Sequence, residues 1–162
     1  MDIRNVILKQ KEVLFGKLER VIDYIPPEQI AWRPERDAIS IIEMLRHLWV
    51  SEEGTRRVAL QNDFSYYETR VPKGLRAAMG TPETLEVERA NLGRVHRETL
   101  AAVGAWPLER FEEERVHEGL KFRRKVYTIL LSINEHTIHH RAQLMTYLRL
   151  LGHPIPEDVA RR

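Results

Sequence analysis

The sequence contains no cysteine. A disulfide framework, a thiolate metal site and a cysteine nucleophile are therefore excluded. Any metal ion bound by this chain would have to be held by histidine, aspartate or glutamate. The 162 residues, 43% of them hydrophobic, are about the length of one domain and can bury a core without disulfides. We expect a single domain over residues 1–162.

Long apolar runs and a strong charge of one sign are also lacking. No segment approaches the ~20 apolar residues that span a bilayer, and the N-terminal residues do not resemble a signal peptide. We therefore expect a cytoplasmic protein with no membrane partner. The net charge is only +2. The densest basic run, KFRRK at 121–125, is interpreted as a solvated surface rather than an anion-binding patch. Nucleic-acid binding needs a clustered basic face and is not expected.

Four long segments have the spacing of apolar residues that is typical of amphipathic helices. They cover approximately residues 2–24, 41–61, 82–105 and 125–151. A looser connection joins the second and third segments and contains one short helical turn, and a short irregular hairpin is expected between the third and fourth. The sequence therefore predicts an all-α fold, a four-helix bundle with a long crossover connection between helices 2 and 3.

Local signals mark the ends of these helices. Ser40 and Glu43 have the spacing of a capping box at the start of the second helix. Thr81 is predicted to cap the third helix, with Pro82 at its first position. The fourth helix is expected to end at Gly152, in the left-handed conformation, with Pro154 just beyond.

The stretch HTIHHRAQ, residues 136–143, places three histidines close together in the fourth helix. His136 and His140 are four residues apart, so both lie on the face that carries the apolar residues, with their rings about 6 Å apart. Two imidazoles at this spacing can bind one metal ion. The pair alone is weak evidence, because two histidines at the edge of a core, satisfied by nearby carbonyls, would have the same spacing.

A third histidine, His47, lies on the inward face of the second helix. The core of a bundle is where facing helices supply metal ligands, and three neutral imidazoles with one open position form a catalytic type of site. Three unpaired buried imidazoles would otherwise cost several kcal/mol. The residues therefore favour a site for one divalent transition metal at His47, His136 and His140. Three histidine ligands do not indicate which transition metal is bound.

The sequence resembles the DinB/YfiT-like superfamily, the damage-inducible DinB family rather than the DNA polymerase of that name. The likeness rests on three stretches: WRPERDAISIIEMLRHL, NEHTIHHRAQL and LRLLGHPIPE. The second matches the signature H-x-x-H-H-R-x-Q. The resemblance implies that His47, His136 and His140 bind zinc or nickel, that the protein forms homodimers, and that His139 is not a ligand. It assigns no role to Tyr66, Tyr67 or Arg70.

The superfamily includes bacillithiol- and mycothiol-dependent transferases, so the resemblance favours thiol S-transfer to a small-molecule substrate, with a low-molecular-weight thiol as a further cofactor. Two alternatives stay open: a metal-dependent hydrolase, and a non-enzymatic bundle that binds a metal or a small molecule. A hydrolase would use a carboxylate as general base beside the metal. None is obvious, because Glu43 is explained by capping and Glu52, Glu53 and Glu135 are interpreted as side or solvent-facing residues.

Three further expectations concern residues outside the metal site. Arg141 is interpreted as a surface or interface residue. The scattered histidines His96, His117 and His153 are interpreted as surface or loop residues. The second helix carries another apolar stripe opposite His47, which predicts a symmetric dimer interface formed by Ile42, Leu45, Trp49 and Leu60.

Overall fold

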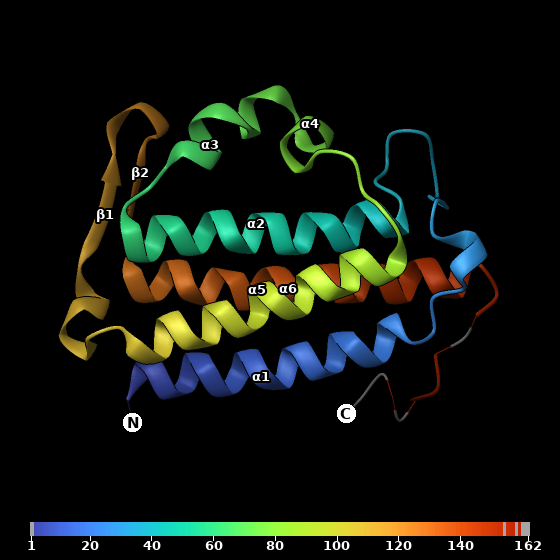
Figure 1. Cartoon of the computed structure of the whole chain (residues 1–162), viewed down its shortest axis with the longest axis horizontal. Coiled ribbons are helices and arrows are strands. Elements are labelled where there is room, and N and C mark those ends of the chain that lie inside the picture. The colour runs from blue at the N-terminus through green and yellow to red at the C-terminus, as the bar shows by residue number, and fades with distance from the viewer. Residues whose placement is uncertain (1, 154, 158, 160–162) are drawn as a thin grey trace.

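Four long helices lie side by side in the computed structural model, which describes residues 2–153, 155–157 and 159 (Figure 1). They are α1 (Ile3–Ile22), α2 (Ile41–Gln61), α5 (Leu85–Ala105) and α6 (Val126–Leu150). Helix α2 packs against α5 and α6, and α1 packs against the same two helices. The prediction of an all-α four-helix bundle is confirmed. Among the described residues, none of the helices combines the length and apolarity needed to cross a bilayer.

The long connection between α2 and α5 runs over the outside of α2 (Figure 1). It contains α3 (Ser65–Thr69), the 3-10 turn η2 (Val71–Lys73) and α4 (Leu75–Met79), more helix than the single turn expected. Each of these helices has only five residues, too short to show a helical period in the sequence. The position of the crossover is therefore confirmed, but its internal structure was underestimated.

The expected hairpin is present between α5 and α6. Strand β1 (Glu114–His117) pairs antiparallel with β2 (Phe122–Lys125), with the 3-10 turns η3 (Leu108–Glu112) before it and η4 (Glu118–Leu120) at its tip. A further 3-10 turn, η1 (Pro27–Gln29), follows α1. In the basic run 121–125 every residue except the half-buried Phe122 is exposed, as predicted.

The helix ends follow the local signals, with one exception. The capping box is formed: Ser40 Oγ accepts a hydrogen bond from the Glu43 amide, and the Glu43 carboxylate accepts one from the Ser40 amide. Helix α5, however, is capped by Thr84 rather than Thr81. The Glu83 amide donates to the side chain of Glu88, which holds the preceding residues outside the helix. Gly152 has the predicted positive φ of 79°, and Pro154 lies outside the described residues.

The buried apolar residues form two main clusters, one toward each end of the bundle. The first contains Leu45, Leu48 and Leu144, and the second contains Val58 and Ile133. On α6, His136 and His140 therefore lie between the two clusters, whereas His47 of α2 lies beside Leu48 of the first cluster. Several buried polar residues accompany them, namely Lys11, His96, Thr99, Asn134 and Thr137.

The second apolar stripe of α2 is covered within the chain. Ile42, Leu45 and Leu60 are buried, and the Trp49 indole donates a hydrogen bond to Glu88 of α5. Because α2 packs against α4, α5 and α6, both of its apolar faces are used internally. The prediction that this stripe forms a dimer interface is therefore wrong, whereas a homodimer through another surface stays a prediction.

Candidate metal centre

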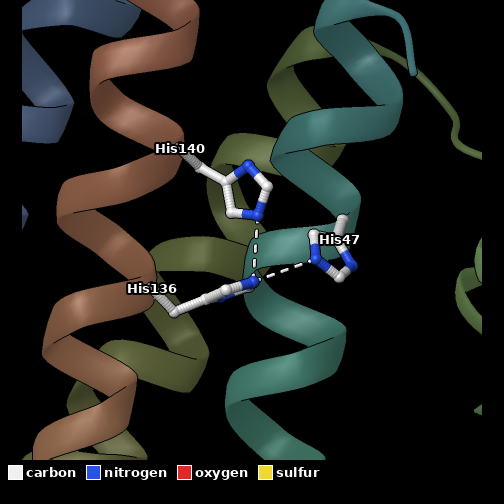
Figure 2. Close-up of side chains that lie close together, drawn as sticks. All are labelled: His47, His136 and His140. Atoms are coloured by element: carbon white, nitrogen blue, oxygen red, sulfur yellow. Dashed lines mark hydrogen bonds between the residues drawn. The ribbon is translucent and has the colours of Figure 1, made fainter. Parts of the chain in front are cut away.

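Three histidine rings converge between α2 and α6 (Figure 2). His136 Nε2 lies 3.0 Å from His47 Nε2 and 2.9 Å from His140 Nε2, and the candidate ligand nitrogens of all three lie within 4.8 Å of one another. The structure thus brings together the three residues that the sequence singled out. They come from two helices, and two of them are one turn apart on α6, as their spacing indicates.

Neighbouring side chains fix the tautomers of the two rings on α6. His140 Nδ1–H donates to Gln143 Oε1 over 2.7 Å. Ser51 Oγ donates its hydrogen to the carbonyl oxygen of His47, so it accepts at 3.3 Å from His136 Nδ1–H. Each neutral imidazole carries one ring proton, so Nε2 of both residues is left with a free lone pair. The polar partners of the outer ring nitrogens are those expected around a metal-binding histidine.

All three rings favour the neutral form. Burial is the main reason that the pKa of His136 falls to about 3 and that of His140 to about 4, and burial also lowers the pKa of His47. Neutral imidazole is the state that binds a metal ion. The site therefore does not need to lose protons near neutral pH before it can accept one.

The arrangement of the three nitrogens is explained better by binding to a divalent cation than by hydrogen bonds between the rings. The lone pairs of His136 Nε2 and His140 Nε2 face each other without a proton to share, an arrangement that hydrogen bonding does not explain. A cation held by these residues would satisfy both lone pairs. One feature of such sites is missing among the described residues, because the buried Nδ1 of His47 has no hydrogen-bond partner.

A cavity of about 400 Å³ opens beside His47 and His136. Helices α2 and α6 form one side of it, and the crossover supplies the rest. Tyr66 lies directly on the α2 backbone, since a Cβ atom at Gly54 would come within 2.6 Å of its ring. The residues lining the cavity are His47, Ser51, Glu52, Thr55, Tyr66, Tyr67, Val71, Leu75, Ala78, Ser132, Ile133 and His136.

Glu52 is the residue of this site that the sequence reasoning missed. Its side chain is only 11% exposed and lines the cavity, whereas the sequence suggested that it lies on a solvent-exposed face. Glu52 Oε1 accepts from Lys11 Nζ and from Thr99 Oγ1, each at 2.7 Å. Its partners lie on α1 and α5, so the residues near Glu52 in the sequence do not predict these contacts. The neighbouring Glu53 is more exposed and lies 3.8 Å from Arg94, which agrees with the expectation for that residue.

The other four histidines lie outside the three-histidine cluster. His139 is exposed, and its ring packs in a T-shaped arrangement against that of His140; it is not one of the three clustered histidines. His96 is buried, contrary to the prediction, because its ring stacks on Phe15 at 3.9 Å. His117 pairs with Glu68 in the crossover, and His153 follows the last helix.

Arg141 is also more enclosed than expected. Two of its guanidinium nitrogens, Nε and Nη1, are buried with no hydrogen-bond partner among the described residues. Burial and the nearby charge of Arg20 lower the pKa of Arg141. The interpretation of Arg141 as a surface residue therefore holds only in part.

The sequence profile of the DinB superfamily matches residues 13–144, a range that contains all three histidines. The chain belongs to the DinB superfamily. A search of the curated proteins found no match. The fold of the superfamily is thus established for this chain, as its resemblance implied.

Two solved structures from Bacillus subtilis share the fold. The DinB-like protein YjoA has 19% identity and a TM-score of 0.67, over 96% of this chain and 95% of its own. YfiT has 15% identity and a TM-score of 0.70, over 92% of this chain and 87% of its own. YfiT is described as "a probable metal-dependent hydrolase with an unusual four-helix bundle topology".

Proposed function

We propose that this DinB-superfamily chain is a metal-dependent enzyme that acts on a small molecule. The observation that carries the proposal is the set of convergent Nε2 atoms of His47, His136 and His140 beside a cavity. Ser51 and Gln143 hold two of the rings so that their lone pairs face inward. Zinc and nickel are the proposed ions, since both accept three imidazole ligands.

A divalent ion held by three neutral imidazoles lowers the pKa of a bound water toward ~7, and deprotonates a bound thiol in the same way. His47 and His136 form the wall of the cavity at which the polar group of the substrate would lie. A side chain that lines the same cavity would have to carry out the proton transfer.

Hydrolysis is the reaction that the cavity supports best. Glu52 supplies the carboxylate whose absence argued against a hydrolase at the level of sequence. Lys11 and Thr99 hold its Oε1 atom, and Oε2 accepts neither of these hydrogen bonds. Glu52 would take a proton from the nucleophile at Oε2 and return it to the leaving group. The description of YfiT as a metal-dependent hydrolase agrees with this assignment.

Thiol S-transfer is the second candidate, favoured by the signature that this chain shares with thiol-dependent relatives. Its last residue, Gln143, accepts the hydrogen bond that orients His140. A thiolate nucleophile needs no carboxylate base once its proton is lost. Glu52 therefore separates the two reactions, because only hydrolysis needs it as a proton carrier.

The test uses zinc-loaded wild type, Glu52→Gln and, as a matched control, Glu53→Gln. Hydrolysis of 4-nitrophenyl esters would be measured across pH. Thiol substitution of 1-chloro-2,4-dinitrobenzene, which releases chloride, would be measured in the same way, with glutathione and with the uncharged thiol 2-mercaptoethanol. We expect ester hydrolysis that falls about 100-fold or more in Glu52→Gln, the usual effect of removing a general base, with Glu53→Gln unchanged.

Each other outcome has a defined meaning. Thiol substitution without hydrolysis, insensitive to Glu52→Gln, would support the second candidate against the first. Zinc bound at one equivalent, but neither activity over a broad panel of esters, amides and electrophiles, would favour the non-enzymatic alternative.

A further inference from the structure

The cavity beside the histidines has an unusual shortage of charge. Among the described residues that line it, Glu52 is the only one with a carboxylate, an ammonium or a guanidinium group. That carboxylate is already paired with Lys11 at 2.7 Å. Away from the histidines, an anionic ligand group would therefore lose its water without gaining a cationic side chain as a partner, and a cationic group would meet a carboxylate whose charge is already compensated.

The arginines of this region are found in a different place. A separate hollow of about 470 Å³ between α2 and α3 is lined by Arg46, Arg57 and Arg70. Tyr66 is the only lining residue that it shares with the cavity beside the histidines. Cationic side chains are thus available on the same elements, but they lie outside the cavity that adjoins the histidines. The lack of charge beside the metal centre is a property of that cavity and not of the whole region.

Polar hydrogen-bond donors in the cavity are equally few. Ser51 and Ser132 donate their hydroxyl hydrogens to backbone carbonyls of their own helices. The hydroxyls of Thr55 and Tyr67 lie 2.7 Å apart. Whichever of the two donates, the other keeps its own hydrogen. The Thr55–Tyr67 pair therefore keeps one hydroxyl hydrogen to donate to a ligand, and the Tyr66 phenol is the other hydroxyl that lines the cavity.

The outer part of the cavity is apolar. Val71 and Leu75, from the crossover, line it although they are 43% and 45% exposed. Two large aliphatic side chains left partly in water at the wall of a cavity gain free energy when an apolar ligand covers them. Together with the Tyr66 ring, they form a surface that matches an alkyl or aryl group.

We propose that the natural ligand is an uncharged small molecule with an apolar arm. Its arm lies against Tyr66, Val71 and Leu75, and one carbonyl or ether oxygen accepts the free hydrogen of the Thr55–Tyr67 pair. The inference rests on the proposed function for the reacting end of the molecule, which faces the histidines. It goes further by defining the substrate class, and it disfavours thiols that carry carboxylates.

The test compares two probes of equal length. Hexanehydroxamic acid and adipic acid monohydroxamate differ only in the terminal group, a methyl or a carboxylate, and both carry a metal-binding head. Their dissociation constants would be measured by calorimetry on zinc-loaded protein. For EDTA-treated protein, saturation-transfer NMR titrations would use hexanamide and adipamic acid, so that the preference is read without metal. We expect the anionic probe of each pair to bind at least about tenfold more weakly, because its carboxylate would lie against the apolar wall of Tyr66, Val71 and Leu75, where no cationic side chain lines the cavity.

A charge-adding variant locates the effect. Leu75→Arg would supply the missing cation at the cavity wall, and we expect the preference to shrink or reverse. Leu108→Arg is the matched control, since Leu108 is similarly exposed at 43% but lies in η3, outside the residues that line the cavity. This control should keep the wild-type preference. Both leucines are partly exposed, so neither change should prevent folding.

The outcomes separate this inference from the proposed function. Equal binding of both probes, with or without zinc, would overturn the inference, and so would a Leu75→Arg protein with the wild-type preference. A protein that prefers hexanamide but binds no zinc would support the ligand class and contradict the metal-dependent function. Zinc binding without any preference would do the reverse.

Discussion

Removing Lys11 should destabilise the protein far more than an ordinary lysine substitution. The Lys11 and Glu52 side chains are 5% and 11% exposed, and their charged atoms lie 2.7 Å apart. Lys11→Met would keep most of the apolar volume but leave the Glu52 carboxylate enclosed without its cation. Breaking one partner of a buried ion pair typically costs about 3–5 kcal/mol. We expect about 3 kcal/mol, at the low end, because Thr99 still donates to Glu52 and the cavity admits water.

The assay is urea unfolding of metal-free protein at pH 7, followed by circular dichroism. The double variant Lys11→Met/Glu52→Gln should recover part of the loss, because it removes the unpaired charge. The control is Lys125→Met, which breaks an exposed pair with Glu112 and should leave the free energy of unfolding unchanged within error. A loss below about 1 kcal/mol for Lys11→Met would refute the claim that this pair is buried and structurally coupled.

Three further predictions concern local structure. Gly54→Ala should destabilise the protein by about 1–3 kcal/mol, because the new Cβ would meet the Tyr66 ring at 2.6 Å. Gly104→Ala has free space around the new Cβ and should not destabilise the protein, and urea unfolding would compare the two variants. His96, whose pKa burial lowers to about 4 from 6.5, stabilises the fold fully above pH 6.5 and progressively less toward pH 4. His96→Phe should therefore flatten stability against pH over that range, by up to about 1.4 kcal/mol per pH unit. Thr84→Ala should lower stability by about 1 kcal/mol and Thr81→Ala should not, since only Thr84 caps the helix; an equal loss in both would contradict the assigned start.

Features that depend on neighbouring residues in the sequence were predicted well. The capping box of Ser40 and Glu43 needs only residues three apart, and the inward face of α6 follows from helical periodicity. His136 and His140 share that face for the same reason. The prediction that Thr81 caps the third helix failed, because Thr84 holds that position. The contact that decides it involves Glu88, whose carboxylate accepts from the Glu83 amide.

Features that depend on distant partners could not be predicted. Glu52 next to Glu53 reads as a charged helix surface, and its role depends on Lys11, 41 positions earlier, which lies on another helix. The second apolar stripe of α2 was real, but a sequence does not show whether such a stripe is covered by the same chain or by a second copy. Here the crossover and α5 cover it. Both errors concern tertiary packing rather than helix formation.

The central claim is that the three histidines hold one divalent ion, and metal content tests it most directly. Tag-free wild type, His47→Ala and His139→Ala would be equilibrated with zinc or nickel, dialysed and measured by elemental mass spectrometry. His139 is the matched control, because it lies on the same helix as two of the ligands but is exposed and outside the cluster. The structure predicts about one equivalent of metal in wild type and His139→Ala, and its loss in His47→Ala. Equal metal content in all three proteins, or none in any of them, would contradict the proposed site.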